Sequence, residues 1–290
     1  MKIVLFGSSG QVGSTLLSYL SSYHSVITDQ KENKRLDLQS EQDIENFLKS
    51  YPADLYINAA AFTNVDDAES SRKECFAVNA GFVDQLVNFL KKNNSSLIHL
   101  STDYVYGNND SDPITENYDL KPMNYYGMTK KIAEEAITNS LNNYFIFRVS
   151  WIYSHIRNNF YKSIRNLLTH KKELSIVDDQ IGSPTPASYI AENISNLVKN
   201  NKLTPNYSGV YNLSASNFTS WYGFANEIVE SFKESNDIDI NLVPIKTEEY
   251  KTPALRQKNS RLNCEKYTTT FNISLKDWKI LFKHHEQQNH

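Results

Sequence analysis

Cysteine is scarce in this sequence: 290 residues contain only Cys75 and Cys264. The two lie far apart and lack the close spacing of metal-ligand pairs, so neither a zinc site nor a disulfide framework is expected. We therefore expect a reduced, cytoplasmic protein, and the sequence predicts no metal site.

Long apolar runs and an excess of one charge are also missing. No run approaches the roughly 20 apolar residues of a membrane span, and the first one, Ile3–Phe6, is too short for a signal peptide. The net charge of −3 gives no reason to expect nucleic acid or an anionic membrane as a partner. A composition of 40% hydrophobic and 22% charged residues is typical of a globular protein, and the length suits one large domain or two fused lobes.

The first half of the chain alternates short apolar runs with helical patterns. This alternation predicts an α/β fold of Rossmann type, a doubly wound parallel sheet with helices on both faces. The expected strands are 2–6, 25–28, 55–58, 97–101 and 144–149, and the expected helices are 14–22, 40–50, 80–92 and 124–140.

The pattern loosens after Trp151, where helical segments (160–169, 187–199 and 220–235) alternate with proline-containing stretches. We expect residues 1–150 to form the dinucleotide-binding domain. Residues 151–290 are then mainly a smaller, interleaved substrate-binding lobe. Strands near 174–178 and 209–213 are expected to rejoin the sheet.

A glycine-rich turn follows the first expected strand and opens a helix. Gly7, Gly10 and Gly13 are spaced three and three, a variant of the G-x-G-x-x-G dinucleotide fingerprint. Such a turn lets the backbone approach a pyrophosphate, which then lies at the helix N-terminus. The alternative is a tight turn without a ligand, but the strand–turn–helix context favours nucleotide binding.

Asp29 ends the second expected strand, at the distance from the turn where a carboxylate holds a ribose 2′-hydroxyl. It could also be a solvated strand end. Lys31 and Arg35 follow closely and could attract a 2′-phosphate instead, so both NADH and NADPH remain possible. Asp37 and Leu38 lie in the next loop and could meet the adenine.

Tyr126 and Lys130 are four residues apart in an expected helix and so share one face. A free tyrosine has a pKa near 10, and a nearby ammonium favours the phenolate and lowers that value. Thr102, at the end of a buried-type strand, could hydrogen-bond a substrate oxygen. Reduction of a ketone needs a hydride and a proton, and Tyr126 would give the proton. An isolated Tyr-x-x-x-Lys match is more often a tyrosine packed beside a lysine, so the glycine turn is what favours catalysis.

Several further motifs occur in order along the chain, and together they carry a family resemblance. The sequence resembles the dTDP-4-dehydrorhamnose reductases, which are extended short-chain dehydrogenases/reductases, over nearly its whole length. The segments that carry the resemblance are 6–13, 58–61, 101–106, 125–130, 148–151, 178–185 and 256–262.

The resemblance implies reduction of the C4 ketone of a dTDP-linked 4-keto-6-deoxy sugar to dTDP-L-rhamnose, using NADPH or NADH, in polysaccharide biosynthesis. Tyr126 and Lys130 match the catalytic pair and also line the cofactor site, and Thr102 matches the hydroxyl that polarises the substrate. The implied substrate contacts are Thr102, Asp103 and Trp151. The implied cofactor contacts include Gln11 and Val12 within the glycine turn, and Ala61, Phe62 and Thr63.

Arg256 is a candidate for the substrate diphosphate because the arginine fork matches phosphate oxygens. Its alternative role is a surface ion pair. The alternative for Asp103 is to cap a loop, and the alternative for Trp151 is to be a core residue. The chain departs from the family pattern at Leu255 and Gln257, where an arginine and a proline are usual. A homodimer is possible, but Thr15 stands where some relatives carry a magnesium-binding glutamate, so no metal is carried over.

Three other functions remain open from the sequence. The chain could reduce a different nucleotide-linked 4-keto-6-deoxy sugar. It could be a dehydratase or epimerase, although related dehydratases have Asp-Glu where this chain has Asp103-Tyr104. It could also be a regulatory subunit that binds a dinucleotide without catalysis.

Overall fold

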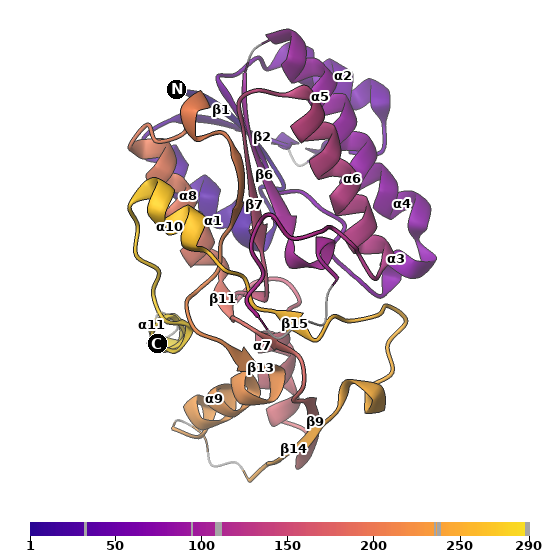
Figure 1. Ribbon diagram of the computed structural model, residues 1–290, viewed down its shortest axis with the longest axis vertical. Coiled ribbons are helices and arrows are strands. Elements are labelled where there is room, and N and C mark those ends of the chain that lie inside the picture. Colours follow the sequence, from indigo (N-terminus) through magenta and orange to yellow (C-terminus); the bar gives the residue numbers. More distant parts are fainter. Residues whose placement is uncertain (32–33, 94, 108–111, 235, 237–238, 288–290) are drawn as a thin grey trace.

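A parallel sheet of six strands organises the molecule (Figure 1). The computed structural model describes residues 1–290 except 32–33, 94, 108–111, 235, 237–238 and 288–290. The strand order reverses beside β1, which has β2 on one side and β5 on the other, and ligands of such sheets bind at the carboxyl ends of the strands at this point. In spatial order the strands are β12 (Gly209–Asn212), β7 (Tyr144–Val149), β6 (Ser96–Thr102), β5 (Leu55–Asn58), β1 (Lys2–Phe6) and β2 (Ser25–Thr28).

Helices cover both faces of this sheet, as the alternating sequence predicts (Figure 1). On one face α1 (Gln11–Ser21), α8 (Ala187–Lys199) and α10 (Glu265–Phe271) share a hydrophobic core with the strands. On the other face α2 (Glu41–Ser50) and α5 (Phe82–Asn93) do so together with α6 (Tyr125–Ser140). Because both faces are buried, the central strands are apolar almost throughout. Within the described residues, no helix has the length and apolar character needed to cross a membrane.

Short elements connect these layers, and most of them were not expected from the sequence. Each of them is too short for the periodic spacing of hydrophobic residues to be recognised in the sequence. They are β3 (Gln30–Lys31), β4 (Lys34–Arg35), α3 (Asp67–Ser70), α4 (Arg72–Phe76), the π-helical η1 (Ala77–Gly81), and the 3₁₀ turns η2 (Asp103–Val105), η3 (Pro205–Tyr207) and η4 (Thr247–Glu249).

A second set of elements forms what we call the distal lobe, at the bottom of Figure 1. Its core lies between α7 (Phe160–Leu168), α9 (Trp221–Lys233) and α11 (Trp278–Gln287). Two small sheets border it. One pairs β8 (Ile152–Tyr153) with β11 (Thr185–Pro186), and the other places β10 (Ile181–Gly182) between β13 (Thr219–Ser220) and β15 (Asn259–Ser260).

One strand expectation is wrong. The strand expected near 174–178 is β9 (Glu173–Val177), which does not rejoin the central sheet but pairs in parallel with β14 (Asn241–Ile245). Its alternate residues Leu174 and Ile176 pack into the core of the distal lobe, and this burial decides its position. The strand expected near 209–213 corresponds to β12, at the edge of the sheet beside β7.

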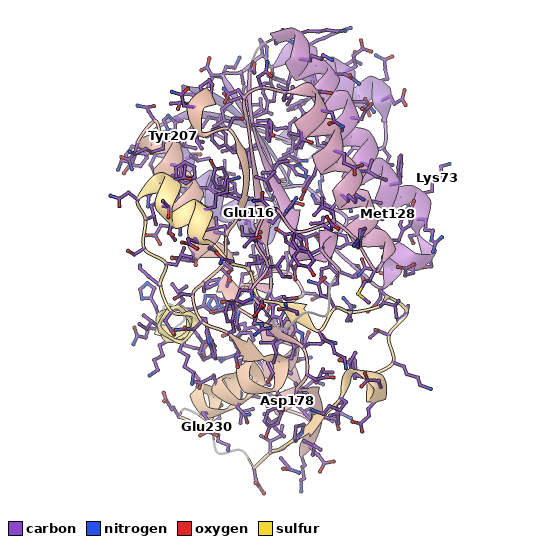
Figure 2. All side chains as sticks on the ribbon, viewed as in Figure 1. Lys73, Glu116, Met128, Asp178, Tyr207 and Glu230 are labelled. Atoms are coloured by element: carbon purple, nitrogen blue, oxygen red, sulfur yellow. The ribbon has the colours of Figure 1, made fainter. Side chains whose placement is uncertain are left out.

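A buried ion pair fastens α6 to the sheet. The Arg148 guanidinium, on β7, contacts the Glu134 carboxylate of α6 at 2.6 Å, and both side chains are almost fully buried. Glu134 also accepts a hydrogen bond from Ser101 on β6. Arg148 further donates to the Tyr106 hydroxyl at 2.7 Å and to the carbonyl of Glu116 at 3.1 Å. Glu116 is labelled near the centre of Figure 2. The pair therefore fixes α6, and with it Tyr126 and Lys130, against β6 and β7.

Replacing Glu134 by glutamine should destabilise the protein strongly. The variant leaves the Arg148 charge buried without its counter-ion, which typically costs about 3–5 kcal/mol. Urea unfolding of the variant and the wild type measures the difference. Glu135→Gln is the matched control, because Glu135 is the next residue of α6 and is exposed. A loss below about 1 kcal/mol for Glu134→Gln would show that the pair does not fasten the helix.

Candidate active site

The glycine turn has the close contacts that a phosphate-binding turn needs. Gly7 has a φ of +79°, and a Cβ there would lie 2.5 Å from the Ala59 carbonyl carbon. A Cβ at Gly13 would lie 2.0 Å from the Gly7 oxygen, so neither position tolerates a side chain. The helix that follows, α1, has Gly10 at its N-cap and therefore no side-chain cap, whereas α2 and α6 are capped by Ser40 and Asn124. The uncapped N-terminus fits the pyrophosphate of a dinucleotide.

Asp29 is tied to this turn. One carboxylate oxygen accepts from the Gly7 N–H at 3.0 Å, and the other accepts from the Ser8 N–H at 3.2 Å and the Ser8 hydroxyl at 2.6 Å. The carboxylate is buried, and the Arg35 guanidinium lies 3.7 Å from it with half of its side chain exposed. Asp29 thus holds the turn in shape, and the partly exposed Arg35, one of the two cations expected to attract a 2′-phosphate, lies beside it.

The other expected cofactor residues lie around the same end of the sheet. Leu38 is buried in the core beside α2 and Asp37 is exposed, and the contact of this loop with the adenine stays a prediction. Phe62 is anchored by Asn79 of η1, whose carboxamide accepts from the Phe62 N–H at 2.8 Å and donates to its carbonyl at 3.2 Å. Ala61 and Thr63 flank this anchored residue and remain partly or fully exposed.

The loop after β8 reaches back to the glycine turn. The Gln11 carboxamide oxygen accepts from the Ser154 hydroxyl at 2.7 Å and from the Asn159 amide at 3.0 Å. The Arg157 guanidinium donates to the Ser9 carbonyl at 2.9 Å. Sequence reasoning missed Arg157, because no local pattern links it to a turn almost 150 residues earlier. Its exposed cation lies beside the uncapped start of α1.

Tyr126, Thr102 and Asp103 meet where α6 begins and β6 ends. Asn124 caps α6 by accepting from the Gly127 N–H at 2.8 Å. Gly127 lets the helix pack tightly, since a Cβ there would lie 2.4 Å from the Tyr104 carbonyl oxygen. The Thr102 hydroxyl donates to the Asp103 carboxylate at 3.0 Å. A hydrogen bond also links Thr102 to the Tyr126 hydroxyl, so the expected proton donor and the expected polarising hydroxyl are side by side.

The surroundings of Tyr126 favour the protonated phenol. Burial raises the Tyr126 pKa well above its ordinary value, and the nearby Asp103 charge adds to this. A hydrogen bond with Thr102 lowers the pKa in part. A phenol that keeps its proton suits a proton donor, because the proton leaves only when a more basic oxygen forms beside it.

Lys130 is fully buried one turn further along α6. Its Nζ donates to the Leu100 carbonyl at 2.7 Å and lies 3.0 Å from His99 Nε2. Burial lowers the Lys130 pKa to about 8, although Glu134 and Cys75 partly oppose this. The lysine side chain is thus held by β6.

The segment 252–260 crosses above Thr102 and Asp103. Gln257, where the family usually has proline, donates to the Asp103 carboxylate at 2.9 Å. Arg256 donates to the Asp66 carboxylate at 2.7 Å and to the Tyr104 hydroxyl at 2.9 Å, so it bridges two parts of the sheet domain. These contacts fit the alternative role of Arg256 as an ion-pair residue. Its contact with a substrate diphosphate stays a prediction.

Trp151 has an unusual backbone and a stacked ring. Its φ is +49°, which is uncommon for a bulky residue, and its ring stacks on Trp221 at 3.5 Å between centroids. On the other side the ring touches Gly182, where a Cβ would lie 2.5 Å from Trp151 Cε2. Backbone strain of this kind gathers at functional sites, and the substrate contact of Trp151 stays a prediction.

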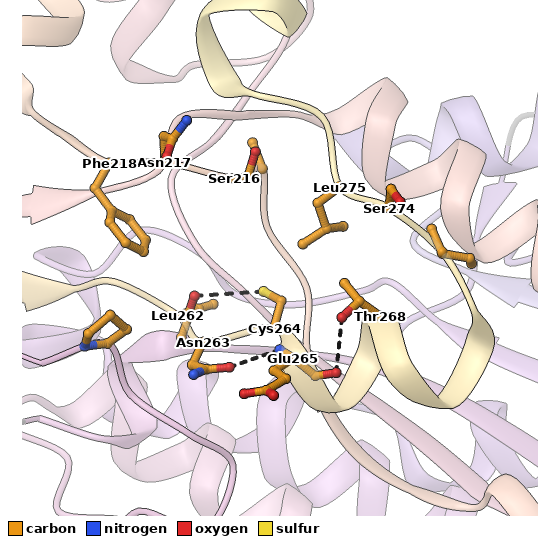
Figure 3. Close-up of a pocket in the computed structure, with 13 residues that line it drawn as sticks. Ser216, Asn217, Phe218, Leu262, Asn263, Cys264, Glu265, Thr268, Ser274 and Leu275 are labelled. Carbon is orange, nitrogen blue, oxygen red and sulfur yellow. Dashed lines mark hydrogen bonds between the residues drawn. The ribbon is translucent and has the colours of Figure 1, made fainter.

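A separate pocket of about 500 Å³ lies between the distal lobe and α10 (Figure 3). It is lined by residues from 215–218, 262–265 and 273–275 together with Pro113 and Thr268, and it contains none of the expected site residues. Cys264 borders it, and burial raises the pKa of this thiol to about 11, which makes it a poor nucleophile. The pocket is therefore not the candidate active site.

The fold and this set of side chains define a Rossmann-fold oxidoreductase of the short-chain dehydrogenase/reductase class. Residues 1–288 match the family model described as the RmlD substrate binding domain, and the chain belongs to that family.

Relatives of known name agree with this assignment. The dTDP-4-dehydrorhamnose reductase of Escherichia coli (strain K12) is 34% identical over 284 residues, covering 97% of this chain and 95% of the relative. A crystal structure of a dTDP-4-dehydrorhamnose reductase from Clostridium acetobutylicum ATCC 824 superposes with a TM-score of 0.89 at 28% identity, covering 99% of both chains. The Bacillus anthracis str. Ames enzyme, solved in complex with NADP, has a TM-score of 0.89 at 26% identity, covering 100% of this chain and 99% of the other.

Asp103 should make stability depend on pH. Burial raises its pKa from 3.8 to about 6, despite opposing hydrogen bonds from Ser260, Thr102 and Gln257. A raised pKa means that the folded state binds the proton more tightly, so stability is lost as the pH rises from about 4 through about 6. The difference between these two pKa values corresponds to about 3 kcal/mol of stability.

Asp103→Asn cannot ionise, so relative to the wild type it should gain about 2.5 kcal/mol between pH 4 and pH 7.5. Urea unfolding at both pH values measures this difference. Asp119→Asn, at an exposed carboxylate, is the control and should show no such change. If Asp103→Asn and the wild type differed in free energy of unfolding by the same amount at both pH values, the raised pKa of Asp103 would be contradicted.

Proposed function

We propose that this chain reduces the C4 ketone of dTDP-4-dehydro-6-deoxy-L-mannose (dTDP-4-dehydrorhamnose) to dTDP-L-rhamnose, with NADPH or NADH. The observation that carries the proposal is the placement of Tyr126 against Thr102, at the same end of the sheet as the glycine turn. Family membership and the names of the relatives support the choice of substrate and of cofactor.

The residues of the site divide the work in a simple way. Thr102 and Tyr126 would both hydrogen-bond the ketone oxygen, and the Tyr126 phenol would give it a proton as it becomes an alkoxide. The hydride comes from the reduced nicotinamide when it is bound. Gly7, Gly10 and Gly13 would approach the pyrophosphate, with Gln11 and Val12 in the first turn of α1. Asp103, Trp151 and Arg256 would contact the sugar nucleotide.

A dehydratase fits the site less well, because Tyr104 stands where a second carboxylate would be needed. Its hydroxyl accepts a hydrogen bond from Arg256 and its ring packs against Tyr126, so it is built into the site as an aromatic residue. We also propose residues 1–150 as the dinucleotide-binding domain and residues 151–290 as mainly the substrate-binding lobe. A homodimer and a cytoplasmic location stay predictions.

The decisive experiment supplies the purified protein with the dTDP-linked 4-keto sugar and either reduced cofactor, and identifies the product by NMR. We expect cofactor oxidation and dTDP-L-rhamnose. Oxidation with a different product would point to another 4-keto-6-deoxy sugar as the natural substrate. Binding of the dinucleotide without any oxidation would favour the regulatory subunit.

Tyr126→Phe should bind the cofactor normally but turn over roughly 10²–10⁴-fold more slowly, because the variant lacks the acidic proton. Steady-state kinetics and a cofactor-binding titration measure the two properties. Tyr125→Phe, the neighbouring residue on α6, is the matched control and should stay close to wild type. A near-normal rate for Tyr126→Phe would remove tyrosine from the mechanism.

Arg35→Ala should lower kcat/KM with NADPH about tenfold, the loss expected for one partly exposed arginine–phosphate contact of about 1.4 kcal/mol. NADH is the internal control, since it has no 2′-phosphate and should be used almost equally well by variant and wild type. Equal losses with both cofactors would show that Arg35 acts only through Asp29, whose carboxylate it approaches.

A further inference from the structure

A row of buried polar side chains leads from the end of β5 to Lys130. It consists of Asn58 on β5, His99 on β6 and Lys130 on α6, whose exposed fractions are 1%, 0% and 1%. Asn58 Nδ2 lies 3.1 Å from His99 Nδ1, and His99 Nε2 lies 3.0 Å from Lys130 Nζ. Buried polar groups need matched donors and acceptors, so the direction of each hydrogen bond can be worked out.

The direction is set at Asn58. The backbone N–H of Ala60 donates to Asn58 Oδ1 at 3.0 Å, which turns the Asn58 NH₂ group towards the imidazole. His99 Nδ1 must then accept. Burial, the largest cause, holds the His99 pKa well below its ordinary value, so the ring is neutral and carries one proton. That proton is on Nε2.

The proton on Nε2 constrains Lys130. His99 Nε2–H points at Lys130 Nζ, which can accept only as a neutral amine because an ammonium has no lone pair. An amine still has hydrogens to donate, and one of them meets the Leu100 carbonyl at 2.7 Å. If Lys130 takes up a proton, Nε2 must accept, the imidazole proton must move to Nδ1, and the Asn58 amide must turn over.

We propose that His99, oriented by Asn58, is a positioning residue that couples the charge of Lys130 to the imidazole tautomer. The amine goes with the Nε2–H tautomer, and the ammonium goes with the Nδ1–H tautomer. Turning the Asn58 amide puts its NH₂ group opposite the Ala60 N–H, so the ammonium form costs a backbone hydrogen bond.

The charged and titratable groups around Lys130 agree with an amine that can be protonated near neutral pH. Burial opposes its charged form, while Glu134 on α6 and Cys75 on α4 favour it, and the neutral His99 on β6 faces it at 3.0 Å. The resulting Lys130 pKa of about 8 lies within reach of ordinary conditions.

The coupling matters for the proposed reduction, on which its functional meaning rests. A nearby ammonium favours the tyrosine phenolate, whereas a neutral amine leaves the Tyr126 phenol protonated and ready to donate. Above about pH 8 the network would favour the amine and with it the protonated phenol, whereas below about pH 8 the ammonium would favour the phenolate. The tautomer itself can be tested without any turnover.

The test is ¹⁵N NMR of the full-length protein labelled at histidine, with the His99 signals identified by their loss in His99→Gln. Between pH 9.5 and pH 6.5 we expect His99 to change from the Nε2–H to the Nδ1–H tautomer, with a midpoint near the Lys130 pKa of about 8. Lys130→Met cannot take up a proton and should hold the Nε2–H tautomer throughout. The signals of the exposed His170 serve as the internal comparison in the same spectra.

Three results would overturn the proposal: one unchanging tautomer in the wild type, an imidazolium at His99, or the same transition in Lys130→Met. Because the NMR readout needs no substrate, a protein that fails to reduce the sugar can still show the coupling. Conversely, an active enzyme without the tautomer change would retain the proposed function and lose this inference.

Discussion

The buried Arg148–Glu134 ion pair is the constraint on which the geometry of the site depends. It joins β7 to α6, and through Ser101 it also holds β6, so three elements that contribute to the site are fixed by one carboxylate. Glu134 is one helical turn beyond Lys130, and Ser101 precedes Thr102 directly. A shift of this pair would move the proton donor and the polarising hydroxyl in relation to each other. Because both charges are buried, each needs the other, and the arrangement is rigid.

Burial shifts the ionisable groups of the site towards their neutral forms. Tyr126 is buried and holds its proton, Lys130 has a reduced pKa, and Asp103 is buried under Gln257. In such surroundings, a developing negative charge on a ketone oxygen would be stabilised by nearby hydroxyl groups more strongly than in water. The same burial makes the hydrogen-bond directions around His99 important, because no water is available to bond a donor or acceptor that lacks a protein partner.

Much of the fold could be predicted because the apolar runs and glycines act locally. The Rossmann-type sheet, the glycine turn and the helix carrying Tyr126 and Lys130 follow from periodicity and spacing. The expectation for β9 was wrong because the sequence of a short apolar strand does not specify which neighbouring strand it pairs with. Here the core of the distal lobe buries its side chains, and β14 lies beside it. Roles that depend on distant contacts, such as those of Arg157 and Asn58, could not be read from local patterns.

By itself, the sequence determined the class of the protein. It also identified Tyr126 as the candidate proton donor and Lys130 as its neighbour on the same helix face. Spacing is enough for this, since an i, i+4 pair on a helix always shares a face. Only the tertiary structure decided what each side chain meets. It turned Asp29 inward onto Gly7 and Ser8, paired Arg256 with Asp66, and directed Lys130 to His99. These partners lie between 21 and 190 residues apart in the chain, and only packing of the folded core brings them within hydrogen-bond distance.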